Sequence, residues 1–136
     1  MNRIEEVPEA YDLCGQVIGL AMKVHSTLGP GYLESVYQNA LIWELRKSGF
    51  NADTERQISV QYDGQIVGAF TADLVVNSSL IVELKASQSL AKAHEVQLVN
   101  YLVATGFDEG LVLNFGGERL EFKKKFRLPK KEQVSL

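Results

Sequence analysis

The segment 73–85, which reads DLVVNSSLIVELK, is the part of this chain that most constrains its fold. Two apolar runs rich in Val, Ile and Leu flank a polar turn at Asn77-Ser78-Ser79. Apolar, β-branched runs bounded by Asn and Ser are typical of a β-hairpin. The segment therefore predicts two adjacent antiparallel strands.

This hairpin would bring three charged side chains together. If the turn is centred on Ser78, Asp73 lies directly across from Glu83. Lys85 then shares the face of Glu83, because strand side chains alternate between faces. A shift of one residue would place Asp73 and Glu83 on opposite faces, so the predicted cluster depends on the register of the turn.

The apolar neighbours of these charges indicate strands near the middle of a sheet, where burying an unpaired charge costs several kcal/mol. Two arrangements would compensate for that cost. A salt bridge could join Lys85 to one of the carboxylates, as in many structural ion pairs. Alternatively, Asp73 and Glu83 could hold a divalent cation and leave Lys85 free for chemistry. The segment alone leaves both arrangements open.

The rest of the chain alternates between helical and strand patterns. Apolar residues at helical spacing, with Gly and Pro as breaks, predict helices over residues 9–28, 32–48 and 89–105. Period-two alternation and β-branched runs predict strands over residues 57–62, 65–76, 80–86, 111–115 and 120–126. We expect one domain over residues 1–136, with a frayed tail from about 128.

Several residues mark the expected ends of these elements. Pro8 and Glu9 suit the first turn of the first helix. Asp63-Gly64 predicts a tight turn between two strands. Ser89 is a candidate N-cap of the last helix, and Gly106 is its expected stop.

Polar residues on the predicted helices have both structural and functional interpretations. His25 lies near the end of the first helix, where a lone histidine is more often packed or capping than a ligand. Glu34 stands in the first turn of the second helix, where it interacts favourably with the helix dipole. His94, Gln97 and Tyr101 form a polar stripe that would face solvent or lie over the charged hairpin.

Composition excludes several classes of protein. No apolar run approaches the length of about 18 residues that spans a membrane, and no secretory signal is visible at Met1. The single Cys14 excludes an internal disulfide and a Cys-rich zinc or iron–sulfur site. We therefore expect a cytoplasmic globular protein.

Charge is unevenly distributed along the chain. The net charge is −3, but residues 119–136 contain seven Lys or Arg and only two Asp or Glu. A basic end on an acidic body could contact phosphates, or it could be a solvated final strand and tail.

The order of these elements and motifs resembles the PD-(D/E)XK nuclease superfamily. Asp73 is followed by Glu83-x-Lys85 and then by Gln97-x-x-x-Tyr101. A nearer resemblance is to the small-protein group named after its GxxExxY motif, which is present here as the segment 31–37, GYLESVY, and is preceded by His25. The similarity runs from about Val17 to Phe126, although Ala72 replaces the proline of the superfamily name.

The resemblance implies an α/β fold with a restriction-endonuclease-like αβββαβ core. In that fold a central mixed sheet, with an antiparallel three-strand meander, is flanked by helices. The resemblance also implies a metal-dependent nuclease that cleaves DNA in preference to RNA.

The resemblance assigns roles to individual residues. Asp73, Glu83 and Glu34 would bind Mg²⁺ or Mn²⁺, and the carbonyl of Leu84 would supply a further oxygen. Lys85 would orient the attacking water and offset charge on the scissile phosphate. The remaining two site residues, Gln97 and Tyr101, would support the lysine and the DNA backbone, as in the exonuclease-type branch.

Two other functions stay open. The acidic body favours a binding module that uses the nuclease fold with weak or no catalysis, because duplex binding relies on basic surface. The exposed final hairpin could instead provide an edge for pairing in an interaction protein. A homodimer or a protein partner would reconcile a small catalytic core with a limited grip on DNA.

Overall fold

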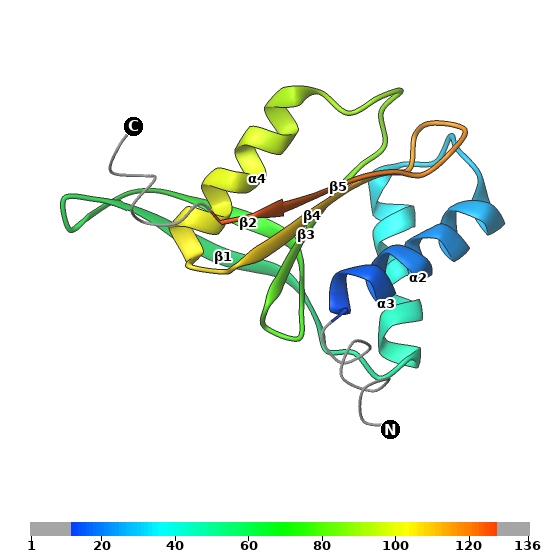
Figure 1. Cartoon of the computed structure of the whole chain (residues 1–136), viewed down its shortest axis with the longest axis horizontal. Helices are drawn as coiled ribbons and strands as arrows, with labels where there is room; N and C mark the ends of the chain where they lie inside the picture. The colour runs from blue at the N-terminus through cyan, green and yellow to red at the C-terminus, as the bar shows by residue number, and fades with distance from the viewer. Residues whose placement is uncertain (1–11, 128–136) are drawn as a thin grey trace, which may run out of the picture.

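A five-stranded sheet lies between one helix on one face and two helices on the other in the computed structural model, which describes residues 12–127 (Figure 1). Its elements are α2 (Leu13–Leu28), α3 (Glu34–Lys47), β1 (Ala52–Tyr62), β2 (Gln65–Val76), β3 (Leu80–Lys85), α4 (Lys92–Thr105), β4 (Glu109–Asn114) and β5 (Glu121–Phe126). None of the described helices is both long and apolar enough to cross a membrane.

The strands follow one another across the sheet in chain order, β1-β2-β3-β4-β5. β1, β2 and β3 form an antiparallel meander. β4 pairs parallel to β3, and a parallel pair needs a crossover connection, which α4 supplies. β5 returns antiparallel to β4. The predicted mixed sheet with its three-strand meander is therefore confirmed.

The turn between β2 and β3 has the predicted register. Leu74 pairs with Val82 and Val76 pairs with Leu80, so the hairpin is centred on Ser78. Asn77 and Ser78 both have positive φ, at 52° and 53°, and the Ser79 N–H donates to the Val76 carbonyl at 3.1 Å, as in a type I′ β-turn. The register places Asp73 across from Glu83, as the sequence predicts.

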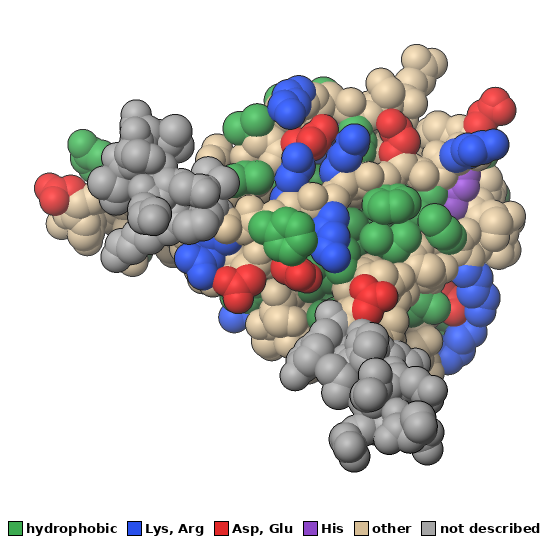
Figure 2. All heavy atoms as spheres, in the orientation of Figure 1, with side chains coloured by type: hydrophobic (Ala, Val, Ile, Leu, Met, Phe, Trp, Pro, Cys, Tyr) green, Lys and Arg blue, Asp and Glu red, His purple; other side chains and the backbone are tan. Residues whose placement is uncertain are grey.

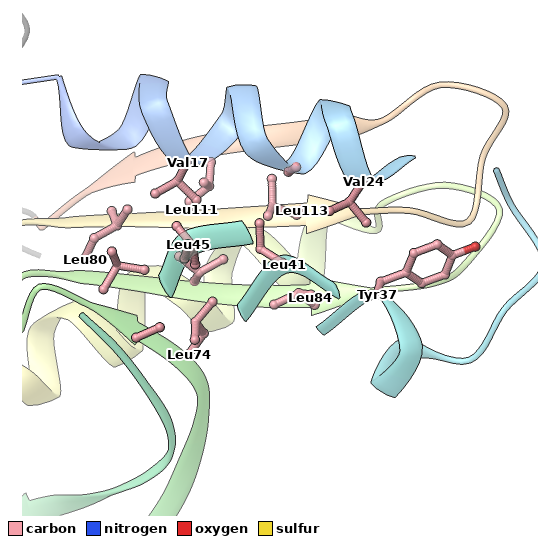
Figure 3. Packing of buried hydrophobic residues seen from close by; sticks show 14 of the residues in the cluster. Val17, Val24, Tyr37, Leu41, Leu45, Leu74, Leu80, Leu84, Leu111 and Leu113 are labelled. Carbon is pink, nitrogen blue, oxygen red and sulfur yellow. The ribbon is translucent and has the colours of Figure 1, made fainter. Parts of the chain in front are cut away.

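Two apolar cores lie on opposite faces of the sheet. On one face α2 and α3 pack against the strands through residues that include Val17, Leu41, Leu45, Leu74, Leu84, Leu111 and Leu113 (Figure 3). On the other face α4 packs through Ile58, Ala72, Val75, Ile81, Leu98, Leu102 and Val112. Because β3 and β4 are covered on both faces, they read as almost continuous apolar runs in the sequence.

Some element boundaries differ from the prediction. β1 begins at Ala52 rather than at residue 57, because the intervening residues are polar and exposed on an edge strand and lack an alternating pattern. The predicted N-cap at Ser89 is wrong: α4 begins at Lys92, with Ala91 as its N-cap. The predicted stop is confirmed, since Gly106 ends α4 with φ of 78°.

The other two helices are present as predicted, but each begins a few residues later than expected. The first begins at Leu13, where Asp12 caps it by accepting a hydrogen bond from the Gly15 N–H. Pro8, Glu9 and the tail from residue 128 lie outside the described residues.

Candidate active site in the fork between β2 and β3

Two carboxylates lie where β2 and β3 separate. The two strands pair only from Leu74 to Val76, after which β2 continues beside β1 and β3 continues beside β4. The Leu84 N–H donates to Oδ2 of Asp73 at 2.8 Å, and the Asp73 N–H donates to Oε2 of Glu83 at 3.2 Å. The carboxylates thus satisfy backbone groups that the fork would otherwise leave without partners.

A local irregularity turns Asp73 toward this fork. Ala72 packs into the core under α4, whereas Leu74 packs into the core under α2 and α3. Residues two apart would share a face in a regular strand, so β2 changes face at Asp73. On β1 the facing residue is Glu55, which has φ of 55°, an uncommon conformation for a residue with a side chain. Irregular backbone of this kind clusters at functional sites.

Burial and like charge act together on Glu83. Its side chain is buried, with 7% exposed. Burial raises the pKa of Glu83 to about 8, and the negative charge of Asp73 adds to the rise. Lys85 lowers the pKa only in part, and no ion pair joins it to either carboxylate within residues 12–127. The structure therefore does not form the salt bridge that was the first of the two predicted arrangements.

Lys85 is the last residue of β3 and is half-buried. It pairs across the parallel ladder with Asn114, and its carbonyl accepts a hydrogen bond from the Phe115 N–H at 2.9 Å. Its backbone is therefore fixed on the side of β4, while its side chain remains on the face of Glu83.

A buried amide holds the loop that follows Lys85. The side chain of Asn114 is fully buried and bonds to both the N–H and the carbonyl of Ser87, each at 2.9 Å. Its Nδ2 also donates to Glu121, which in turn accepts from the Leu90 N–H. The contact is close, because a Cβ on Gly116 would lie 2.1 Å from the Ser87 carbonyl oxygen. These bonds fix the connection from Lys85 to α4.

α4 brings Tyr101 toward the carboxylates. Burial raises the pKa of Tyr101, and the charges of Glu83 and Asp73 raise it further. Its ring stacks on Phe70 with ring centres 3.5 Å apart. Gln97 lies one helical turn earlier and is exposed. Of the predicted polar stripe, Tyr101 therefore lies near the carboxylates, whereas Gln97 is exposed.

Glu34 is exposed in the first turn of α3 and is not joined to the carboxylates by any bond between the described residues. Gln38, one turn further along α3, donates to the backbone carbonyl of Asp73 at 2.8 Å. Since positions four apart share a helix face, Glu34 and Gln38 lie on the same side of α3.

The loop before Glu34 is fixed by buried rings. The hydroxyl of Tyr37 donates to the Gly29 carbonyl at 2.6 Å and accepts from the Tyr32 N–H at 3.1 Å. Within the same segment, Gly31 has φ of 111°. The buried His25 donates from Nε2 to the carbonyl of Gly117 at 2.9 Å, so it packs as predicted. The motif GYLESVY thus contains two residues that shape the loop and one acid that the loop positions.

The described residues offer two clustered carboxylates to a metal ion. No group of three or more His, Cys, Asp and Glu side chains within residues 12–127 is arranged to hold one. Mg²⁺ commonly binds through one or two carboxylates and completes its shell with water and substrate phosphates. Glu83 is buried, Asp73 is partly buried, and neither forms an ion pair with another described residue, so the two carboxylates fit such an ion.

Three residues near the site were missed in the sequence. Gln38 is spaced four residues from Glu34, which was a usable signal. Asn114 ends an apolar run, and a polar residue inside a buried strand needs partners. The role of Glu121 could not be predicted locally, because Glu121 contacts Asn114 only when β5 pairs with β4.

Comparisons with known proteins agree with this geometry. The family model for the PD-(D/E)XK nuclease superfamily matches residues 11–126. No curated protein matches the chain. The solved structure named "Crystal structure of SSO0001" superposes with a TM-score of 0.53 at 19% identity, covering 74% of this chain and 52% of that one. The chain therefore spans about half of that neighbour, and the likeness shows a shared restriction-endonuclease-like fold. On the family match, the chain belongs to the PD-(D/E)XK nuclease superfamily.

Proposed function

We propose that this protein is a metal-dependent nuclease that hydrolyses phosphodiester bonds, in DNA in preference to RNA. The observation that carries the proposal is the pair of carboxylates in the β2–β3 fork, Asp73 and Glu83, which lack a cationic partner within the described residues. A buried acid beside a second, partly buried acid is costly unless a cation balances their charge.

Asp73 and Glu83 would hold Mg²⁺ or Mn²⁺, since both ions prefer oxygen ligands. When bound, such an ion supplies Lewis-acid chemistry, which activates water and offsets charge on a phosphate. The Leu84 carbonyl would be a further ligand, because its own N–H is held by Asp73. Glu34 would join from α3 as a metal or water ligand, supported by the contact of Gln38 with Asp73.

Three other residues would act on the substrate. Lys85 shares the face of Glu83, and its ammonium would orient the attacking water and offset charge on the scissile phosphate. Tyr101 and Gln97 would support Lys85 and contact the substrate backbone, supported by the influence of both carboxylates on Tyr101. The rigid loop after Lys85 would keep these groups in register.

We would test the proposal by incubating the purified protein with labelled single-stranded, duplex and branched DNA and with RNA. Each substrate would be tested with Mn²⁺, with Mg²⁺ and with EDTA. Lys85→Ala and Asp73→Asn should each lower cleavage by more than about a hundredfold, because each removes charge from the reacting centre. Asn can still accept the hydrogen bond from the Leu84 N–H, so Asp73→Asn should remain folded.

Matched controls come from exposed residues of the same types. Lys47→Ala and Asp53→Asn change charges outside the fork and should leave cleavage unchanged. Cleavage that survives in Lys85→Ala and Asp73→Asn would identify a contaminating nuclease. Calorimetric titration with Mn²⁺ gives a second measurement, and no binding to the wild type would refute the metal site.

A second function is a nucleic-acid or protein binding module without catalysis. It is supported by the net charge of −3 and by the lack of a ready three-ligand cluster within residues 12–127. Acidic and basic side chains are mixed over the face shown in Figure 2, rather than forming one broad basic surface. Binding of DNA that is independent of Mn²⁺ and unchanged in Lys85→Ala, without cleavage, would favour this module.

A further inference from the structure

The hairpin of β1 and β2 extends beyond the rest of the sheet (Figure 1). We call residues 57–72 of this hairpin the arm. β1 is the edge strand, and β2 pairs with β3 only at residues 74–76. Both long edges of the arm therefore lack a strand partner among the described residues. A two-stranded hairpin is only marginally stable by itself in water.

The tip of the arm is apolar and exposed. Tyr62, Ile66 and Val67 expose 74%, 68% and 62% of their surfaces. The base of the arm is covered, because Ile58 and Phe70 pack with α4. Apolar surface is therefore concentrated at the end of the arm that projects from the molecule, as is typical of an interaction site.

The arm carries almost no charge. Asp63 is its single charged residue, and residues 57–72 contain no Lys or Arg. Nucleic acid is therefore an unsuitable occupant, since phosphates need cationic partners. Exposed edge strands usually carry charges, especially Lys, that prevent pairing with other chains. The edges of the arm lack such protection beyond Arg56.

An uncharged groove lies between the arm and α4. It has a volume of about 650 Å³. The groove is lined by Ser59, Val60, Gln61, Asn100, Val103 and Ala104. Val103 is itself 42% exposed, so apolar surface is available on the wall that α4 provides.

We propose that the arm is a dimerisation element whose partner is a second copy of this chain. Two arms related by a two-fold axis would run antiparallel, so that each tip lies beside the groove of the other copy. Apolar side chains of each tip would enter that groove, and the free edges would pair. The arrangement is self-complementary and buries few like charges, because each arm contributes only Asp63. It does not depend on the proposed nuclease activity.

The other candidate edge is less suitable. β5, in the final hairpin that the sequence suggested for pairing, carries Lys123, Lys124 and Lys125 in succession. Two such edges would bring lysines of both copies close to one another, and this like charge opposes self-pairing. The arm therefore provides the better surface for a second copy.

The test is analytical ultracentrifugation of the whole chain over a concentration range of about 1–300 µM. The wild type should shift reversibly from monomer to dimer. Ile66→Lys and Val67→Lys should each weaken dimerisation at least about tenfold, because an ammonium would be buried without a partner. Trp43→Lys is the matched control, since Trp43 is 67% exposed on α3 and should leave the dimer unchanged.

Hydrogen exchange of the wild type provides an independent measurement that needs no variant. The amides of residues 57–72 should exchange more slowly as protein concentration rises through the dimer transition. A monomer throughout the range would overturn the proposal. A dimer that is insensitive to Ile66→Lys and Val67→Lys, or arm protection that does not change with concentration, would also overturn it.

Discussion

Glu83 links the electrostatics of the fork to the stability of the whole protein. Its pKa is raised to about 8, chiefly by burial and then by Asp73. In the unfolded chain the pKa of the same carboxyl is close to its ordinary value of 4.5. Between these two pH values the folded state holds a proton that the unfolded state releases, so raising the pH favours unfolding.

We therefore predict that the metal-free protein loses stability as pH rises from about 4.5 to about 8. The loss should be on the order of a few kcal/mol in the free energy of unfolding, because one pKa unit corresponds to about 1.4 kcal/mol. Urea denaturation in EDTA at several pH values would measure it. Adding Mn²⁺ at pH 8 should restore stability, because the ion favours the ionised carboxylate.

The Glu83→Gln variant supplies the control for this titration. It removes the ionisable group and keeps an oxygen that can accept from the Asp73 N–H. Its stability should change little over the same pH range. An equal slope in both proteins would assign the pH dependence to other groups.

Asn114 should matter for stability although it contacts no proposed substrate. Replacement by Ala leaves the N–H groups of Ser87 and Gly116 without their buried acceptor. We predict that Asn114→Ala lowers the free energy of unfolding by roughly 2–4 kcal/mol. Denaturant titration would measure this, with the exposed Asn39→Ala expected within about 0.5 kcal/mol of the wild type. Equal stability of both variants would contradict the role of the buried amide.

At the scale of elements, the β2–β3 turn holds residues in a conformation that suits glycine. Ser78 occupies the second position of the turn with φ of 53°, where Asn-Gly is the favoured pair. We predict that Ser78→Gly stabilises the protein by roughly 0.5–1 kcal/mol, as measured by thermal denaturation. Ser79→Gly, at the last position of the turn, should give no gain, because Ser79 does not have a positive φ. A destabilised Ser78→Gly would show that the turn is not strained.

The loop before α3 depends on one hydroxyl. Tyr37→Phe removes bonds to the Gly29 carbonyl and the Tyr32 N–H while keeping the ring in its stack on Phe115. We predict a loss of roughly 1–3 kcal/mol, with faster hydrogen exchange at Tyr32. Tyr62→Phe, at an exposed ring, is the control and should change neither quantity. Unchanged exchange at Tyr32 in Tyr37→Phe would refute this role.

The predictability of each element follows from its environment. The last residues of β2, the strand β3 and the Gly106 stop were predictable because burial on both faces and a left-handed cap leave clear patterns. The start of β1 was not, because exposed edge residues need no apolar alternation. Ser89 failed as a cap because the loop before α4 is held from outside, by Asn114 and Glu121. Long-range bonds of this kind leave no local signal.

At the scale of the whole molecule, Lys123 of β5 lies on the same face of the sheet as Glu83. Glu83 pairs with Val112, and Val112 pairs with Lys123, so the three form one row across the sheet. Lys125 is bound to Glu95 of α4 at 2.7 Å, whereas Lys123 is exposed. Basic side chains gather beside acidic ones over α4 and β5 in Figure 2.

If the protein binds DNA as proposed, Lys123 should contact a phosphate. We predict that Lys123→Ala weakens binding equally for all sequences and reduces the salt slope by about 0.9 in log affinity against log salt. Fluorescence anisotropy over a series of salt concentrations would measure the slope. Lys47→Ala, an exposed lysine on α3, is the control, and equal slopes in both variants would exclude a phosphate contact at Lys123.

The candidate site was predictable in part. The pairing of Asp73 with Glu83 follows from the register of one short turn, which local residues set. The fork itself was not predictable, because it depends on β2 remaining with β1 while β3 remains with β4. The position of Glu34 relative to the carboxylates also depends on how α3 packs against the sheet, which no short segment encodes.

The bonds in the fork affect how relatives that have lost activity should be recognised. Asp73 and Glu83 each hold a backbone N–H, so a chain that had abandoned catalysis would still be destabilised by losing them. An acid or amide at these positions in a related protein is therefore weak evidence that the related protein is catalytically active. The Lys85 side chain makes no hydrogen bond or ion pair within residues 12–127. Once catalysis is lost, Lys85 could therefore be substituted during evolution without a loss of folding stability. Lys85 should therefore distinguish catalytically active relatives from inactive ones better than either Asp73 or Glu83 does.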